Sequence, residues 1–172
     1  MDPVTSSVLV ARAPLEVFEY LGDVANHAEF TDRFTDQWHL TREDSYGRGA
    51  GARFHLKMRR NRFGWMDMTV AEFVPPRRIV LVGRAGKYNR IRAVQTFELE
   101  PVSGSSTRVH HSFETQPKLP TDRFFERRGF FKRSWKRSMK RLQAILEGEA
   151  DPGRRATIAG GPRKPATGSP IR

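Results

Sequence analysis

The chain has 172 residues and a formal net charge of +12 at pH 7, from 31 Lys and Arg against 19 Asp and Glu. This length suits one globular domain, or a domain of about 150 residues with a tail, and argues against two full domains. The absence of cysteine excludes disulfide scaffolds, thiolate metal sites and cysteine nucleophiles. The sequence has neither a signal-peptide pattern at its N-terminus nor an apolar run of about 18 residues, so we expect a soluble cytoplasmic protein.

The first predicted elements are a strand and two short helices. Residues 4–12 are rich in β-branched side chains, which favour a strand. Pro14 suits the first turn of a helix over residues 14–21, and Gly22 ends it. Asp23 can cap a second short helix that runs through Phe30 and Phe34. The pattern predicts a small helix-turn-helix after the first strand.

The middle of the chain predicts six antiparallel strands. Apolar residues alternate with period two, and Gly, Pro and Ser clusters separate the runs. We place the strands at residues 37–44, 51–60, 65–74, 78–84, 90–100 and 106–115. A final helix is predicted over residues 121–147, with Thr121 and Asp122 at its start.

The positive charge is concentrated in this last helix. Residues 123–146 hold nine cations and one acidic residue, a net of +8, whereas residues 1–122 carry only +2 (17 minus 15). At 100° per residue the apolar side chains fall within an arc of about 120°. They are Phe124, Phe131, Trp135, Met139, Leu142, Ile145 and Leu146. The helix is therefore predicted to bury one face and to present cations on the other.

The C-terminal end of the chain has a different composition. Residues 149–172 contain Gly, Pro, Ala and Arg with few large apolar side chains, too few to offset the entropy of ordering. We therefore predict one domain over residues 1–148 and a disordered basic tail over residues 149–172.

Three short motifs occur in an order that resembles a known family. Ala13-Pro14 opens the first helix and Asp23 closes it, and Pro75-Pro76-Arg77 forms a turn between middle strands. Residues 97–101 and 104–109 resemble the hairpin that leads into the last strand. With the order of elements, these motifs resemble the START-like (SRPBCC) superfamily, in the style of its polyketide cyclase/dehydrase and lipid-transport group.

The resemblance implies both a fold and a class of function. The implied fold is the α+β helix-grip fold, in which a curved seven-stranded antiparallel sheet surrounds a long C-terminal helix. Members bind lipids, sterols, quinones or polyketides in a cavity between sheet and helix, and some catalyse cyclisation or dehydration there. Because fold does not settle function, carrier and cyclase/dehydrase both remain open for this chain.

Strand alternation predicts which side chains face such a cavity. Residues of one parity share a face of the sheet, and an apolar set marks the inner face. Residues 79–82 are apolar on both faces, so their orientation is not predicted. In residues 65–74 both faces are also fairly apolar, which leaves the inward face ambiguous. The predicted ligand-binding residues are Phe54, Leu56, Met58, Met66, Met68, Val70, Gln95, Phe97, Val109 and Phe113 from strands, and Arg128, Phe131, Trp135 and Met139 from the helix.

Polar residues within these sets are the candidates for chemistry. Gln95 and His111 lie on inward parities, where they either bond each other as a core pair or serve a ligand. If the protein is an enzyme, we expect His111 to carry the proton and Gln95 or Arg128 to stabilise an oxyanion. Arg128 lies at the edge of the apolar arc, and the adjacent Gly129 leaves open whether it faces inward or solvent.

Other chemistry lacks support in the sequence. No Gly-rich phosphate loop joins a strand to a helix, and the five histidines show no metal-ligand spacing. No Gly-x-Ser-x-Gly motif indicates a covalent nucleophile. We therefore predict neither a metal nor a cofactor.

The basic helix face offers an alternative function. It is predicted to consist of Lys132, Arg133, Lys136, Arg137, Lys140 and Arg141. Such a face can associate with an anionic membrane surface, RNA or an acidic protein, or be simply solvated. It lacks interleaved aromatic residues, which disfavours stacking on single-stranded bases.

Overall fold

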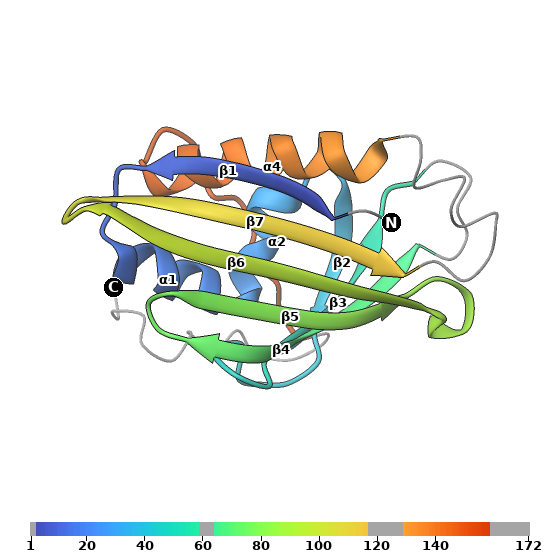
Figure 1. The fold of residues 1–172 in the computed structure, drawn as a ribbon. Coiled ribbons are helices and arrows are strands. Elements are labelled where there is room, and N and C mark those ends of the chain that lie inside the picture. The colour runs from blue at the N-terminus through green and yellow to red at the C-terminus, as the bar shows by residue number, and fades with distance from the viewer. Residues whose placement is uncertain (1–2, 59–63, 117–128, 159–172) are drawn as a thin grey trace.

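A single antiparallel sheet curves around one long helix (Figure 1). The computed structural model describes residues 3–58, 64–116 and 129–158. The strands lie in the order β1-β7-β6-β5-β4-β3-β2. They are β1 (Val4–Val10), β2 (Thr35–Leu40), β3 (Gly51–Leu56), β4 (Trp65–Val74), β5 (Arg78–Ala85), β6 (Ile91–Ser103) and β7 (Ser106–Gln116).

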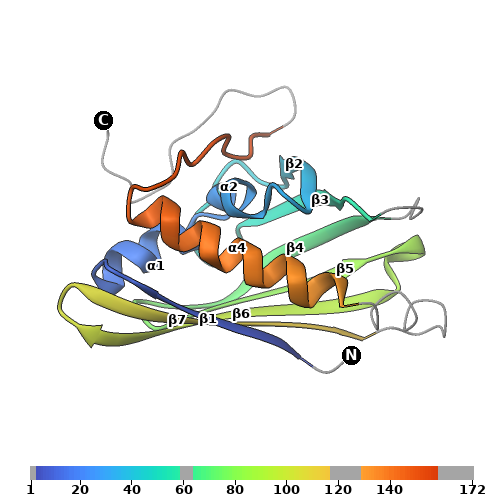
Figure 2. The same cartoon turned by 90° about the horizontal axis from the view of Figure 1, so that it is seen from above.

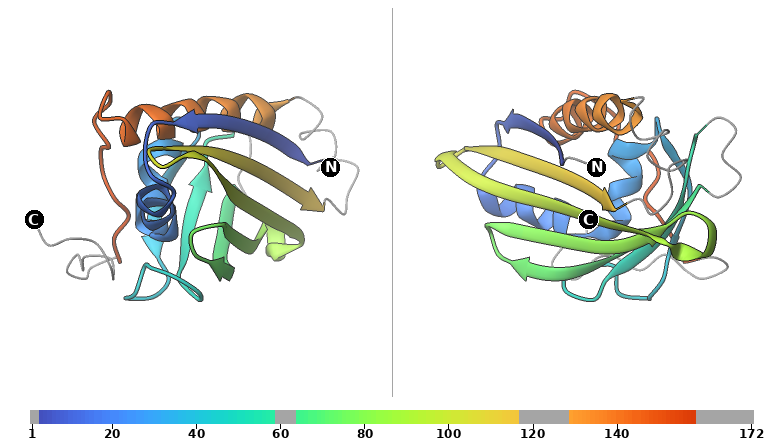
Figure 3. Two further views of the ribbon diagram at one scale, coloured as in Figure 1. Left: turned by 60° about the vertical axis from the view of Figure 1, so that its left-hand side comes forward. Right: turned by 45° about the vertical axis from the view of Figure 1, so that its right-hand side comes forward.

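Helices α1 (Pro14–Gly22), α2 (His27–Thr31) and α4 (Phe130–Leu146) occupy the concave side of the sheet (Figures 2 and 3). Helix α1, the 3-10 helix η1 (Val24–Asn26) and α2 join β1 to β2, and the 3-10 helix η2 (Lys87–Asn89) joins β5 to β6. Helix α4 lies across the open side of the sheet, next to α2. This arrangement confirms the predicted helix-grip fold. None of the helices in the described ranges is long and apolar enough to span a membrane.

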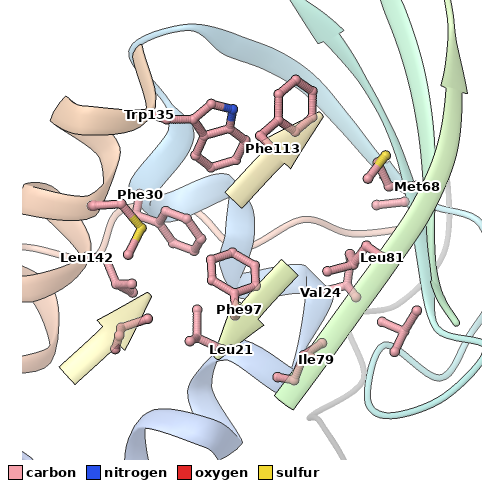
Figure 4. Close-up of a cluster of buried hydrophobic side chains, with 14 of the residues drawn as sticks. Leu21, Val24, Phe30, Met68, Ile79, Leu81, Phe97, Phe113, Trp135 and Leu142 are labelled. Carbon is pink, nitrogen blue, oxygen red and sulfur yellow. The ribbon is translucent and has the colours of Figure 1, made fainter. Parts of the chain in front are cut away.

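The alternating pattern that predicted the strands also orients them. In β4 the buried residues are Met66, Met68 and Val70, as predicted. In β5, whose orientation the sequence left open, Ile79 and Leu81 are buried, whereas Val82 is 43% exposed. Together with residues of α1, α2 and α4, the inward side chains form one continuous core (Figure 4).

Element boundaries differ from prediction where local capping decides them. Asp23 caps η1, with its Oδ1 accepting from Ala25 N at 3.1 Å, and the following helix α2 ends at Thr31, before Phe34. Strands β2 and β3 end at Leu40 and Leu56, earlier than predicted. Helix α4 begins directly after Gly129, whose φ of 69° suits glycine. The predicted helical residues 121–128 lie outside the described residues.

The C-terminal segment, residues 149–158, lies against the domain. Composition predicted a disordered tail from residue 149, but the backbone of this segment bonds to two other elements: Ala156 N donates to Ala25 O, and Leu40 N donates to Thr157 O. Arg155 forms an ion pair with the buried Asp23. These polar contacts hold the segment despite its few apolar side chains. Residues 159–172 of the predicted tail lie outside the described residues.

Candidate functional site

The predicted ligand-binding residues gather on the inner face of the sheet and the facing side of α4. Met58 is half-buried, and Arg128 lies outside the described residues. The others are buried: Phe54, Leu56, Met66, Met68, Val70, Gln95, Phe97, Val109, Phe113, Phe131, Trp135 and Met139. They form a largely apolar surface between β3 to β7 and α4.

Gln95 and His111 form the polar part of this surface. The two side chains come from neighbouring strands, and Gln95 Nε2 lies 3.3 Å from His111 Nε2. The other ring nitrogen, Nδ1, lies 3.4 Å from Ser6 Oγ on β1. If the amide of Gln95 donates to Nε2, then the proton of the neutral imidazole is on Nδ1 and is donated to Ser6. The two predicted polar residues therefore bond each other, and both nitrogens of His111 have partners.

Aromatic rings enclose the imidazole of His111. Its centroid lies 4.2 Å from the ring of Trp135 and 5.1 Å from that of Phe97. Burial lowers the pKa of His111 to about 3, and repulsion from the protonated form of His27 adds to this effect. His111 is consequently neutral at pH 7, which suits hydrogen bonding better than proton transfer.

His27 is a second buried histidine, which the sequence did not single out. Its Nε2 donates to Leu21 O at 2.8 Å, and its ring contacts Phe30 and Phe97. Burial lowers the pKa of His27 to about 4. The sequence does contain a sign that His27 is buried. His27 lies three residues before the apolar Phe30, and residues at that spacing share one helix face.

Two buried polar atoms on α4 have no hydrogen-bond partner among the described residues. They are the indole nitrogen of Trp135 and the hydroxyl oxygen of Ser138, one turn further along. Both side chains belong to the helix face that covers the sheet. Sequence patterns place a Trp on a buried face but do not show whether its N–H finds an acceptor.

The basic face of α4 is exposed. Lys132, Arg133, Lys136, Arg137 and Lys140 are exposed, and none forms an ion pair within the part of the chain that the structure describes. Arg141, which the sequence assigned to the same face, is instead half-buried. Its Nε lies 3.2 Å from Asp32 Oδ1 and donates to Glu29 O at 2.9 Å. The basic face therefore consists of five residues, because Arg141 serves contacts within the fold.

The described part of the chain also has surface grooves. One of about 440 Å³ lies between α2, β2 and the C-terminal segment, with Asp32, Lys57 and Arg154 in its wall. Another of about 580 Å³ runs over β1, β7 and β6, and its lining includes Ser6 and His111 as well as outward-facing residues such as Thr96 and His110. Within the described ranges, no group of three His, Asp or Glu side chains could hold a metal ion.

Comparisons with known proteins give the same fold and one family. The family model described as polyketide cyclase / dehydrase and lipid transport matches residues 1–147. No curated protein sequence matches the chain.

Solved structures with this fold share little sequence with the chain. TTHA0849 from Thermus thermophilus is 13% identical with a TM-score of 0.65, over 87% of this chain and 99% of that one. Norcoclaurine synthase from Thalictrum flavum, in complex with dopamine and hydroxybenzaldehyde, is 10% identical with a TM-score of 0.62, over 87% and 89%. DynU16, from the dynemicin biosynthetic locus, is 19% identical with a TM-score of 0.59, over 91% of this chain and 51% of that one. At these identities the similarity shows the shared fold alone.

Proposed function

The chain belongs to the polyketide cyclase/dehydrase and lipid transport family, and from this premise we propose that it binds a hydrophobic small molecule between its sheet and α4. The ligand classes that we consider are lipids, quinones and polyketide-like molecules. The observation that carries the proposal is the inner face itself, where mostly apolar side chains surround the hydrogen-bonded pair of Gln95 and His111. Apolar walls with few polar groups are typical of small-molecule sites.

The geometry favours a binding role over acid/base catalysis by His111. A catalytic base works best with a pKa near the operating pH, whereas burial lowers the pKa of His111 to about 3. Its two nitrogens are also engaged with Gln95 and Ser6. Carrier is therefore the leading role. The cyclase or dehydrase role would need a ligand that displaces one of these partners.

Two of the similar structures support a small aromatic or polyketide-like ligand. Norcoclaurine synthase holds dopamine and hydroxybenzaldehyde, and DynU16 comes from a biosynthetic locus. Both share the fold of this chain and no more than a fifth of its sequence. The two molecules bound to norcoclaurine synthase support the size and aromatic character of the ligand that we propose, and the locus of DynU16 supports a role in biosynthesis.

Thermal unfolding with a panel of apolar molecules tests the binding proposal. Because a molecule that binds only the folded state stabilises it by mass action, a ligand at 100 times its Kd should contribute about 2.7 kcal/mol. We expect at least one lipid, quinone or aromatic polyketide to raise Tm by several degrees. A panel that leaves Tm unchanged throughout would count against the proposal.

The five exposed cations of α4 favour a second candidate function, association with an anionic membrane surface. The apolar side of α4 is buried against the sheet, so the helix cannot insert and binding must be largely electrostatic. The absence of aromatic side chains between these cations makes RNA a weaker alternative. An acidic protein is the remaining alternative.

Replacing three of these cations should weaken vesicle binding strongly. Each cation near anionic lipid contributes about 1 kcal/mol, so the triple variant Lys132→Gln, Arg133→Gln, Lys136→Gln should bind about 100-fold more weakly. Sedimentation with vesicles of phosphatidylcholine and phosphatidylserine at low salt measures this. The charge-matched control is Arg48→Gln, Arg84→Gln, Arg92→Gln, which alters exposed cations outside α4. Equal losses in the two variants would reject a specific role for α4.

A further inference from the structure

The indole N–H of Trp135 is a buried donor without an acceptor in the part of the chain that the structure describes. The side chain is only 5% exposed, and its nitrogen has no hydrogen-bond partner among the described residues. An indole N–H can only donate, and buried Trp usually finds an acceptor for it. Leaving this donor unsatisfied carries a free-energy cost that an acceptor on a bound molecule would remove.

The described rings around Trp135 do not supply that acceptor. The ring of His111 lies 4.2 Å from the indole, but its two nitrogens face Gln95 and Ser6. The other close rings are hydrocarbon: Phe34 at 5.2 Å and Phe113 at 5.6 Å. Figure 4 shows the indole nitrogen on the side of the ring nearer Phe113, toward the strands. The free donor therefore lies on the surface that we propose binds the ligand.

The same surface carries no charged side chain among the described residues. The buried polar residues on the inward parities of β6 and β7 are all uncharged at pH 7: Gln95, Thr107, His111 and Thr115. The buried acids Asp23 and Glu29 come from the segment between β1 and β2 and already have partners: Arg155 pairs with Asp23 and Tyr20 donates to Glu29. An anionic ligand would lose its hydration without gaining a countercharge.

From this donor and these uncharged walls we infer that the ligand is a neutral, largely aromatic molecule with a carbonyl oxygen, and that Trp135 Nε1–H donates to that oxygen. This inference rests on the proposed binding function and narrows it. Aromatic rings on the ligand suit a neighbourhood in which Phe34 and Phe113 already pack against Trp135. The unpartnered hydroxyl of Ser138, one turn along α4, is a second group for a polar substituent.

Three probes of one size separate the contributions of shape, carbonyl and charge. They are menadione (2-methyl-1,4-naphthoquinone), 2-methylnaphthalene, which lacks the carbonyls, and 2-naphthoate, which is anionic. The chain has no cysteine that menadione could alkylate. Equilibrium dialysis against the wild type should give the tightest binding for menadione and the weakest for 2-naphthoate.

Trp135→Phe tests the donor directly, because it removes the N–H and keeps an aromatic ring. We expect it to weaken menadione about three- to tenfold and to leave 2-methylnaphthalene nearly unchanged. The matched control Trp65→Phe makes the same change on the outer side of β4, near Arg53 and His55, and should leave both affinities unchanged. A folding defect would weaken the binding of 2-methylnaphthalene as well as that of menadione. A loss confined to menadione therefore cannot come from misfolding of the variant.

The possible results distinguish a failure of this inference from a failure of the proposed binding function. An unchanged menadione affinity in Trp135→Phe, or an equal loss for menadione and 2-methylnaphthalene, would overturn the role of the donor while leaving apolar binding intact. Tighter binding of 2-naphthoate than of menadione would overturn the neutral ligand class. Failure of all three probes to bind the wild type would contradict the inference together with the proposed function.

Discussion

Arg155→Leu is expected to destabilise the folded chain by about 3 kcal/mol, because it leaves the carboxylate of Asp23 buried without its cation. The Asp23 side chain is 1% exposed, and its Oδ2 pairs with Arg155 Nη2, whose side chain is 18% exposed. The other carboxylate oxygen, Oδ1, accepts from the backbone N–H of Ala25. Urea unfolding monitored by circular dichroism measures the change in the free energy of unfolding.

Two further variants establish that the ion pair is the cause. The adjacent Arg154 is exposed, so Arg154→Leu removes the same charge at the surface and should cost less than about 0.5 kcal/mol. Adding Asp23→Asn to Arg155→Leu should recover part of the loss, since an amide oxygen can still accept from Ala25 N while the buried charge is gone. Equal stabilities of the two Leu variants would show that the C-terminal segment contributes nothing through this pair.

Acidification from pH 7.5 to pH 4.5 should destabilise the protein through its two buried histidines. Burial lowers the pKa of His27 to about 4 and that of His111 to about 3, from the ordinary value of 6.5. Below pH 6.5 the unfolded chain therefore binds protons that the folded chain does not. The stabilisation is complete above pH 6.5 and is lost as the pH falls toward these values, by about 2–3 kcal/mol for each histidine at pH 4.5.

Replacing His111 should remove one of these contributions. Between pH 7.5 and pH 4.5 the free energy of unfolding should fall in both proteins. The fall should be about 2–3 kcal/mol smaller for His111→Gln than for the wild type. His110→Gln is the matched control, because the side chain of His110 is exposed and bonds to Glu100 on the outer side of the sheet. Urea unfolding at both pH values measures the difference. If His111→Gln and the wild type showed the same pH dependence, the imidazole would not be held neutral by burial.

Much of the fold was predictable because each strand obeys a local rule. The alternation in residues 65–74 predicted β4 with its observed bounds, and the inward parity of Met66, Met68 and Val70 is confirmed. Residues 79–82 could not be oriented, since all are apolar; their pairing with Gln95 and Phe97 on β6 turns Ile79 and Leu81 inward. The orientation of β5 therefore depends on its register with β6, which the sequence of β5 alone does not contain.

The candidate site was predictable in its position and less so in its detail. Parity placed Gln95 and His111 on one face, and they do bond each other. The contact between His111 and Ser6, by contrast, joins residues 105 positions apart, and the pair of Asp23 and Arg155 joins distant segments as well. A periodic pattern shows which face a residue occupies, but the partner of a polar atom depends on tertiary packing. For this reason the unpartnered N–H of Trp135 emerged only from the structure.

Native mass spectrometry of the protein purified from its own host can detect a molecule bound between the sheet and α4. We expect a population whose mass exceeds that of the chain by one small molecule, which is released on denaturation and proves apolar and uncharged. A protein that carries no such molecule, and that also fails to bind menadione, 2-methylnaphthalene or any lipid added at saturating concentration, would contradict a ligand site between the sheet and α4.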